Sequence, residues 1–318
     1  MSIRASQLFV LILLLGLSRI GSPAADWKIE SGQNKDAPGE KVDFLEGGKP
    51  IARFIYGKGQ FKPYLHVFAP DGALLTNPGL DSNGKTTGLY PHHRGIFIGW
   101  KIESALGTDD LWHMTKGCTM TLDRIVRTDV TSSDKGGSAK LVAAVGWHAA
   151  KKDESGSNLL LNEQRTITIH REGNGALLID CLFVLTPERD LRFVGDLQHS
   201  GIHFRASNEV ATRAKETAYV YEPDKVVKGS DLKWVRLIFP IGEHWYASTQ
   251  LNPPSNPVEE LSMRDYGRFG YFFKRSLKKG EPLTLSYRFV IEEAAKPSPE
   301  LLVEQRKKGQ ALYDAFVR

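Results

Sequence analysis

Cysteine is scarce in this chain, and no thiolate motif is present. The 318 residues include two cysteines, Cys118 and Cys181, and no Cys-x-x-Cys pair of the kind found in thiolate metal sites and dithiol redox sites. These counts exclude a disulfide framework. One bridge between the two cysteines stays open, because disulfides form in exported proteins.

The common sequence motifs of nucleotide-binding proteins and hydrolases are also missing. The chain has no Gly-x-Ser-x-Gly turn, no phosphate-binding loop, no Gly-x-Gly-x-x-Gly after a strand and no His-Glu-x-x-His. Lysine and arginine number 42 against 37 acidic residues, but they are scattered along the chain. Because nucleic-acid binding requires a basic stripe or a recognisable motif, no nucleic-acid partner is predicted.

One long apolar run is present, and it lies at the N-terminus. Residues 8–17 ("LFVLILLLGL") follow Arg4 and precede the small residues Ser22 and Ala24. A bilayer-spanning helix needs about 20 apolar residues, so this run is too short to be an anchor. We expect residues 1–24 to be a cleaved signal peptide. The mature protein is then periplasmic or extracellular, with no membrane segment after cleavage.

The remaining chain has the pattern of an all-β protein. Short segments rich in β-branched and aromatic residues alternate with Gly, Pro, Asp and Ser, as in "LLLNEQRTITIHR" and "PLTLSYRFVIEE". "YLHVFA" and "ALLT" are expected as strands joined by a turn at Pro70-Asp71-Gly72. We predict one large antiparallel β-sandwich over residues 25–296, with a supersandwich-like arrangement. Residues 297–318 are expected to form a helix on its outside, capped by Ser298, with a break at Gly309 left open.

Two segments concentrate polar residues inside β-rich sequence. "GLYPHHRGIFIGW" carries His92, His93 and Arg94 just before a strand, where a loop residue can bind a ligand or simply form a polar turn. "LQHSGIHFRAS" places His199, His203 and Arg205 on one side of a strand. That side faces either a ligand or solvent. We expect the two segments to meet in the fold.

Three further places carry candidate residues. Asp110 and Trp112 lie shortly after the first histidine segment, and Arg264 and Tyr266 precede the aromatic segment "RFGYFF". Glu163 lies on the apolar side of its strand, where a carboxylate is costly unless paired. A buried ion pair with Arg165 and a role as general base are both open.

A metal site would need ligands from separate elements. His199 and His203 are about 13 Å apart along an extended strand and cannot share an ion there. One combination is His92 or His93 with His203 and Glu163. No cofactor is identified, and a divalent metal stays an open alternative.

These segments together resemble a known family. "KPYLHVFAPDGALLT", "GLYPHHRGIFIGW", "DDLWH", "NEQRTITI", "HSGIHFRAS" and "RDYGRFGYFF" occur in the order typical of the PmoA-like exported bacterial proteins labelled "methane oxygenase". The resemblance covers about residues 50–292, and the His-His-Arg-Gly element is its most specific part. It implies a domain similar to the galactose-mutarotase-like supersandwich, a fold used by sugar epimerases, lyases and hydrolases.

The leading hypothesis is a carbohydrate-active enzyme that acts on a glycan or another small-molecule substrate. His92, His93, His203 and Glu163 are the predicted catalytic residues. The predicted substrate-binding residues are Arg94, Arg205, Asp110, Trp112, His199, Arg264 and Tyr266. The alternatives are a metal-dependent oxygenase, which the family label suggests, and a glycan-binding module without catalysis.

Overall fold

The computed structural model describes residues 26–133, 136–171, 175–196, 198–222, 232–257 and 260–318. The expected signal peptide, residues 1–24, lies outside this described part. Within it, no helix combines the length and the apolar character needed to cross a bilayer.

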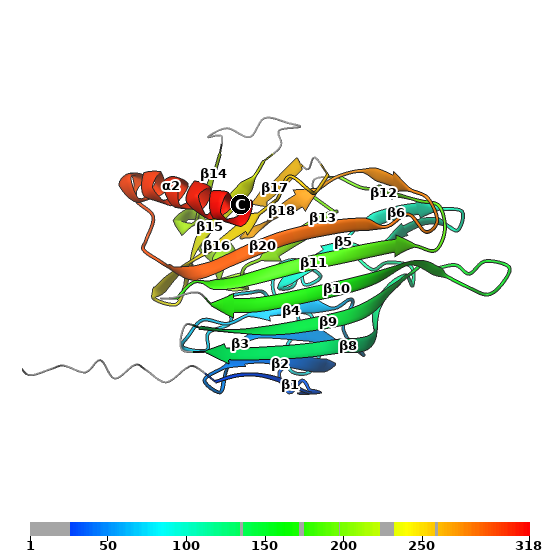
Figure 1. Ribbon diagram of the computed structural model, residues 1–318, viewed down its shortest axis with the longest axis horizontal. Coiled ribbons are helices and arrows are strands. Elements are labelled where there is room, and N and C mark those ends of the chain that lie inside the picture. The colour runs from blue at the N-terminus through cyan, green and yellow to red at the C-terminus, as the bar shows by residue number, and fades with distance from the viewer. Residues whose placement is uncertain (1–25, 134–135, 172–174, 197, 223–231, 258–259) are drawn as a thin grey trace, which may run out of the picture.

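Three antiparallel sheets make up the described fold (Figure 1). The first sheet contains, in spatial order, β1 (Trp27–Gln33), β2 (Glu40–Glu46), β3 (Lys49–Tyr56), β4 (Tyr64–Val67), β5 (Ile96–Gly99), β13 (Gly201–Arg205), β18 (Arg268–Phe272) and β17 (Glu260–Arg264). The second contains β14 (Ala218–Tyr221), β15 (Trp234–Ile241), β16 (His244–Leu251), β20 (Leu283–Ala294), β11 (Leu177–Pro187), β10 (Leu159–Arg171), β9 (Gly136–His148) and β8 (Thr119–Ser133). The third contains β19 (Arg275–Leu277), β12 (Leu191–Val194), β6 (Lys101–Ser104) and β7 (Gly107–Asp110).

The first and second sheets pack face to face around one large apolar core. Val42 and Phe54 from the first sheet belong to the same buried cluster as Ile167, Phe183 and Leu285 from the second. Alternation along β10 explains this packing: Ile167 and Ile169 are buried, and Thr166 and Thr168, which alternate with them, are half-buried. The predicted all-β antiparallel sandwich with a C-terminal helix is confirmed.

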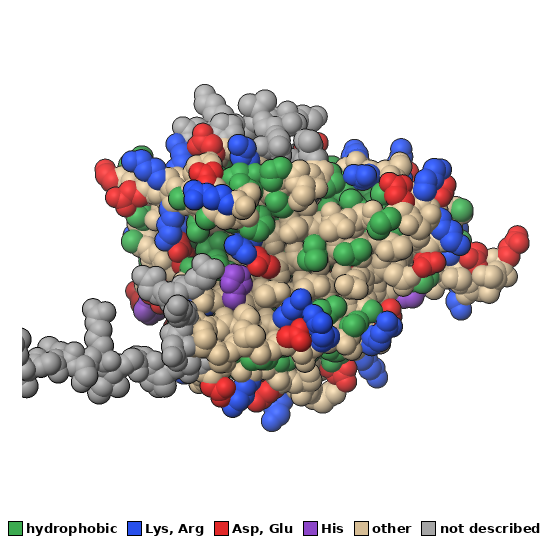
Figure 2. Space-filling view, in the orientation of Figure 1, with side chains coloured by type: hydrophobic (Ala, Val, Ile, Leu, Met, Phe, Trp, Pro, Cys, Tyr) green, Lys and Arg blue, Asp and Glu red, His purple; other side chains and the backbone are tan. Residues whose placement is uncertain are grey.

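The outer face of the second sheet is turned toward the viewer in Figure 2. On this face, lysine and arginine side chains lie in small groups together with acidic side chains, and the drawn residues form no continuous basic stripe (Figure 2).

The strand expected over residues 73–76 is not formed as such. The turn at Pro70-Asp71-Gly72 is present, with the Gly72 N–H donating to the Ala69 carbonyl. After it, the chain makes only isolated bridges, Phe68 to Leu74 and Thr76 to Ala206. The segment leaves its hairpin because Thr76 and the following residue bond to the end of β13 instead, where the Asn77 N–H donates to the Arg205 carbonyl.

The C-terminal helix α2 (Pro299–Phe316) runs without a break and lies over β14, β15 and β16 (Figure 1). Its N-terminus is capped by Ser298, whose Oγ accepts the Leu301 N–H at 3.2 Å. Leu302, Leu312 and Phe316 pack on the second sheet. A short helix α1 (Asn208–Thr212) and a 3₁₀ turn η1 (Ala214–Glu216) follow β13, and neither was expected.

Glycine is required at position 309 of α2 because Trp234 packs against it, and not because of the helix conformation. It is buried, and a Cβ atom at this position would lie 2.4 Å from Cζ3 of Trp234. Gly309→Ala is therefore expected to lower the free energy of unfolding by about 1–2 kcal/mol, because overpacking costs more than the helix propensity gained. Chemical denaturation measures this change. Lys307→Ala, at an exposed position of the same helix, is the control, and equal stability of the two variants would contradict the explanation.

Candidate functional site

The loop between β4 and β5 holds His92 and His93 in fixed positions. The His93 N–H donates to the Tyr90 carbonyl at 2.9 Å, and Asn77 Nδ2 donates to the His93 carbonyl at 2.6 Å. Gly95 ends the loop with φ 55°, and a Cβ there would lie 2.2 Å from the Leu65 carbonyl oxygen. Only glycine fits this close approach, so the loop is pinned directly before β5.

Two short turns repeat the sequence Asp-x-x-His. In the first, Asp110 Oδ1 accepts the N–H groups of Trp112 and His113, and Oδ2 accepts from His113 Nδ1 at 2.8 Å. In the second, Asp196 Oδ1 accepts the Gln198 N–H at 2.7 Å and contacts His199 Nδ1 at 3.0 Å. In each turn the carboxylate fixes the backbone and the imidazole together.

The two turns place their histidines in one row with His92 from the loop before β5, so that three partly exposed imidazoles lie side by side. The ring centroids of His92 and His113 are 4.8 Å apart, and those of His113 and His199 are also 4.8 Å apart. His93 lies behind His92 at 4.1 Å between centroids. Beside them, the rings of Tyr90 and Tyr266 pack together, with 4.9 Å between their centroids. We call His92, His113, His199, Tyr90 and Tyr266 the ring surface.

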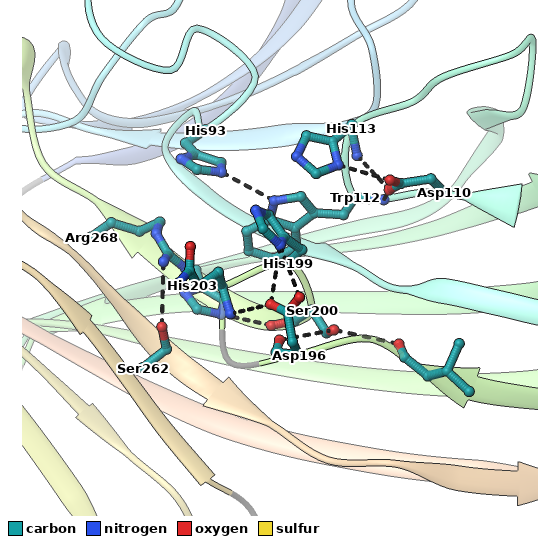
Figure 3. Close-up of polar contacts among 12 residues, drawn as sticks. His93, Asp110, Trp112, His113, Asp196, His199, Ser200, His203, Ser262 and Arg268 are labelled. Carbon is teal, nitrogen blue, oxygen red and sulfur yellow. Dashed lines mark hydrogen bonds and ion pairs between the residues drawn. The ribbon is translucent and has the colours of Figure 1, made fainter.

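Beneath the ring surface lies a buried polar layer around Trp112 (Figure 3). Trp112 Nε1 donates to His93 Nε2 at 3.1 Å, and its ring packs against His203 at 4.8 Å. His203 bonds to the Ser200 carbonyl through Nε2 at 2.8 Å and to Arg268 Nη1 through Nδ1 at 3.0 Å. These partners assign the proton of His203 to Nε2, because the guanidinium can only donate. Arg268 also donates to the Tyr266 hydroxyl, so the buried layer is tied to the ring surface.

Burial keeps the inner histidines neutral. It lowers the pKa of His92 to about 3, with the neighbouring His113 adding to the effect. Burial also lowers the pKa of His93 and His203, and the charge of Arg268 lowers both further. Burial opposes ionisation of Asp110, but hydrogen bonds from His113 outweigh it and lower its pKa to about 2. The carboxylate that orients His113 is therefore charged at neutral pH.

The buried layer also contains cations whose described partners are all uncharged. Arg268 bonds to Tyr266, His203 and Ser262, and Arg205 bonds to backbone carbonyls, among them that of Tyr266, and to Asn208. Lys62 donates to the Leu111 and Trp112 carbonyls at 2.9 Å, and burial lowers its pKa to about 7. Within the described chain none of these three forms an ion pair with a carboxylate, although the charge of Asp110 acts on Lys62 and opposes the lowering of its pKa. Such sites carry an unbalanced positive field.

Backbone strain is concentrated in the same loops. Of the described residues other than glycine, three have positive φ: Tyr90 at 53°, Met114 at 59° and Lys116 at 58°. They flank His92 and His113 in the sequence. Side chains in this conformation cost free energy and persist where the surrounding structure imposes them, which is common at functional sites.

The structure brings most of the sequence-predicted site residues together. β13 pairs with β5, so that His203 lies opposite Phe97, and the two histidine segments meet as expected. The predicted residues that line the ring surface or the buried layer are His92, His93, Asp110, Trp112, His199, His203, Arg205 and Tyr266. Trp112 is fully buried, so it supports the ring surface from below. Both faces of β13 are buried, so the solvent-facing alternative is wrong, and His203 and Arg205 are enclosed by protein rather than open to a ligand. β13 begins at Gly201, so the expectation that His199 lies on this strand is also wrong: it lies in the preceding turn.

Glu163 lies elsewhere, in the core between the sheets. It is 1% exposed, contacts Arg165 Nε at 2.5 Å and accepts from Trp147 Nε1 at 2.7 Å. The described contacts of its carboxylate are with these two residues and none is with a histidine. They match the ion-pair alternative.

The three arginines predicted to bind substrate form hydrogen bonds with other groups of the protein. Arg205 is fully buried and ties together the turns at Tyr266 and Asn208. Arg94 is also fully buried, donates to the Pro91 carbonyl and Gln60, and lies over Tyr64. Arg264 donates to the Met263 carbonyl and lies opposite Arg268 in the sheet. These contacts stabilise the fold, and none of the three arginines is part of the ring surface.

Five residues of the site escaped the sequence prediction: Tyr90, His113, Asp196, Arg268 and Lys62. A signal existed for two of them, because Asp110-Leu111-Trp112-His113 and Asp196-Leu197-Gln198-His199 share the spacing Asp-x-x-His. Arg268 and Lys62 have no local signal, since their partners come from distant strands.

The cysteines form no bridge, and Cys118 contacts only the backbone of the site, where its Sγ donates to the Asp110 carbonyl at 3.3 Å. Cys118 and Cys181 are both buried free thiols, so the bridge left open by the sequence is not formed. Burial raises the pKa of Cys118 to about 11 and that of Cys181 to about 12. Both are unreactive under ordinary conditions.

Comparisons with known proteins give a family and a fold likeness. A family model described as "Family of unknown function (DUF6807)" matches residues 41–303. No curated protein matches the sequence. Galactose 1-epimerase from Lactobacillus acidophilus NCFM aligns with a TM-score of 0.39 and 7% identity, over 85% of this chain and 100% of that one. 4-alpha-glucanotransferase from Thermococcus litoralis aligns with a TM-score of 0.29 and 10% identity, over 85% of this chain and 40% of that one. None of these carries a methane oxygenase label.

Proposed function

The chain belongs to DUF6807, a family of unknown function, and we propose that it is an exported enzyme that performs acid–base chemistry on a sugar or glycan. One observation carries the proposal. Two aspartate-bound histidines, His113 and His199, lie 4.8 Å apart between ring centroids on a partly exposed surface. Export is supported by the N-terminal sequence alone.

The paired histidines have the arrangement that proton transfer requires. Each carboxylate holds Nδ1 of its imidazole, so Nε2 is the nitrogen left to accept or donate a proton. One imidazole removes a proton from a sugar carbon or hydroxyl, and the other donates to the oxygen that gains electrons. Epimerases, lyases and hydrolases share this need for one base and one acid.

The rest of the ring surface suits a sugar. Tyr90 is 44% exposed and Tyr266 is partly exposed beside it. Aromatic rings provide an apolar face for the C–H groups of a sugar and a polar edge for its hydroxyls. His92 stays neutral at physiological pH and can hydrogen bond without adding charge.

Loss of one imidazole is expected to abolish most turnover. His113→Gln or His199→Gln should lower kcat about 10²–10⁴-fold, because each removes a general acid or base. Asp110→Asn should also lower kcat, since an amide no longer selects the reactive tautomer of His113. A panel of sugars and glycans followed by NMR identifies the reaction. His244→Gln, at an exposed position, is the control. Full turnover in the double histidine variant, His113→Gln/His199→Gln, would contradict the mechanism.

A metal-dependent oxygenase is the second candidate, and the same histidines favour it. Metal-binding histidines commonly give their other ring nitrogen to a carboxylate, as His113 and His199 do. In the described part of the chain, no group of three or more His, Cys, Asp or Glu side chains is arranged to hold a metal. Elemental analysis of purified wild-type and His113→Ala protein decides, because only an oxygenase would lose a stoichiometric metal.

A glycan-binding module without catalysis is the third candidate, favoured by the exposed ring of Tyr90. It predicts glycan binding with no product by NMR, and binding that persists in the histidine variants.

A further inference from the structure

A cavity of about 660 Å³ lies directly beside the ring surface. It is bounded by β6 and β7, by the turn after His113 and by the residues that follow β9. Its lining residues are Lys101, Leu106, Gly107, Thr108, Asp109, Asp110, Thr115, Lys116, Ala150 and Lys151. Asp110 belongs to both places, because the carboxylate that holds His113 also lines the cavity. The volume is within the range of about 300–1,000 Å³ common for small-molecule sites.

The charges of this cavity favour an anion. Lys101, Lys116 and Lys151 line it, and none of them has an ion-pair partner within the described chain. The two aspartates are already engaged, Asp110 by His113 and Asp109 by the Ala150 N–H at 2.8 Å. Lys116 also has the positive φ of 58°. Three ammonium groups therefore face two carboxylates, which leaves the side chains of the cavity with an excess of one positive charge.

The neighbouring buried layer acts in the same direction. Arg268 is 1% exposed, Arg205 is fully buried, and the described partners of both are uncharged. Fields from such groups decay slowly through a poorly hydrated interior. An anionic ligand near the ring surface would therefore be attracted by the charges of Arg268 and Arg205, which are buried beneath that surface.

We propose that the cavity binds the acidic unit of an anionic oligosaccharide, whose next unit lies on the ring surface. This rests on the proposed function and adds the substrate class: at least two sugar units, one of which carries a carboxylate or a sulfate. The lysines bind the acidic group. Asp109 Oδ1 accepts the Ala150 N–H, so its other oxygen, Oδ2, accepts a hydrogen bond from a ring hydroxyl.

The test compares acidic ligands with neutral ligands of the same skeleton. Digalacturonate and a sulfated carrageenan disaccharide are titrated calorimetrically into the mature protein, alongside the methyl ester of the first and the desulfated form of the second. We expect at least one acidic probe to bind at least tenfold more tightly than its neutral partner. The preferred pair shows whether the group is a carboxylate or a sulfate. Equal binding of the acidic and neutral forms, or no binding of either acidic probe, overturns the proposal.

Variants then locate the acidic unit. Ala150→Trp fills the cavity from an exposed position and should weaken binding of the acidic probe at least tenfold, and Lys151→Met should weaken it several-fold. Lys152→Trp is the matched control, because Lys152 is exposed and does not line the cavity. Unchanged affinity in Ala150→Trp overturns the inference.

The inference and the proposed function can fail separately. Turnover of neutral sugars that Ala150→Trp does not affect would remove the inference alone. Cavity-dependent binding of an acidic disaccharide, with turnover unchanged in the double histidine variant, would remove the proposed mechanism alone.

Discussion

Replacing Glu163 with glutamine is expected to lower the free energy of unfolding by about 3–5 kcal/mol, without any direct effect on the chemistry. The carboxylate makes a bidentate pair with Arg165, with Nε–Oε1 at 2.5 Å and Nη2–Oε2 at 3.1 Å, and both side chains are almost fully buried. Glutamine keeps the size of the side chain but removes its charge. The guanidinium of Arg165 is then left in the core without an anion, and desolvation makes this costly.

The experiment separates this ion pair from a catalytic role. Thermal and urea unfolding are measured for Glu163→Gln, Arg165→Met and the double variant Glu163→Leu/Arg165→Met. Each single variant should be strongly destabilised, and the double variant should recover most of the loss, because an apolar pair leaves no buried charge. Glu154→Gln, at an exposed position, is the control. A Glu163→Gln protein with wild-type stability and no turnover would instead favour the general base.

Much of the fold could be predicted because it is written in local patterns. "LLLNEQRTITIHR" coincides with β10 residue for residue, and "PLTLSYRFVIEE" matches β20 to within one residue at each end. Ser298 and Pro299 mark the start of α2. These signals depend on side-chain alternation and on capping, which involve neighbours in sequence. Residues 73–76 do not form the predicted strand because Leu74 bridges locally to Phe68 while Thr76 bridges to Ala206, which is more than a hundred positions away.

The site could be predicted in part, for a related reason. Histidines that interrupt β-rich sequence drew attention to His92, His93, His199 and His203, and strand pairing places them together. Which of them is exposed depends on what covers them. His203 is enclosed by Trp112 and Arg268, which come from separate elements, whereas His199 stays at the surface in its turn. Sequence position alone carries no measure of that burial.

The hydrogen-bond partners of the predicted arginines could not be read from the sequence either. Arg94 and Arg205 looked like ligand-binding groups because no acidic residue stands next to them in the sequence. In the fold, uncharged groups accept most of their hydrogen bonds, and backbone carbonyls are prominent among them: Arg94 donates to Pro91, and Arg205 to Ala206 and Tyr266. Carbonyl acceptors are present at every residue, so the sequence contains no sign of where an arginine finds them.

Acid is expected to unfold this protein more readily than the number of its carboxylates would suggest. His66, His93 and His203 are each at most 3% exposed, and burial lowers the pKa of all three below the unfolded value of about 6.5. Below that pH the unfolded chain binds protons that the folded chain cannot. Stability is therefore complete above about pH 7 and falls as the pH drops, by up to about 1.4 kcal/mol per pH unit for each histidine.

The contacts of His203 show why the folded protein resists protonation. Its Nδ1 accepts a hydrogen bond from Arg268, so a second proton would place an N–H against a guanidinium. Three such histidines acting together give a slope of about 4 kcal/mol per pH unit near pH 5. A typical domain is stable by about 5–15 kcal/mol, so unfolding should be complete within a few pH units below neutrality.

Denaturant unfolding between pH 8 and pH 4 measures this slope. His203→Gln offers an acceptor to Arg268 and a donor to Ser200 but cannot titrate, so its slope should be smaller by about 1.4 kcal/mol per pH unit. His66→Gln should reduce the slope in the same way if the first variant folds poorly. His244→Gln is the control, because His244 is exposed and its loss should leave the slope unchanged. Stability that stays constant from pH 7.5 to pH 5 would mean that the buried imidazoles accept protons in the folded state. Neutral histidines in the buried layer beneath the ring surface would then be an incorrect description of this site.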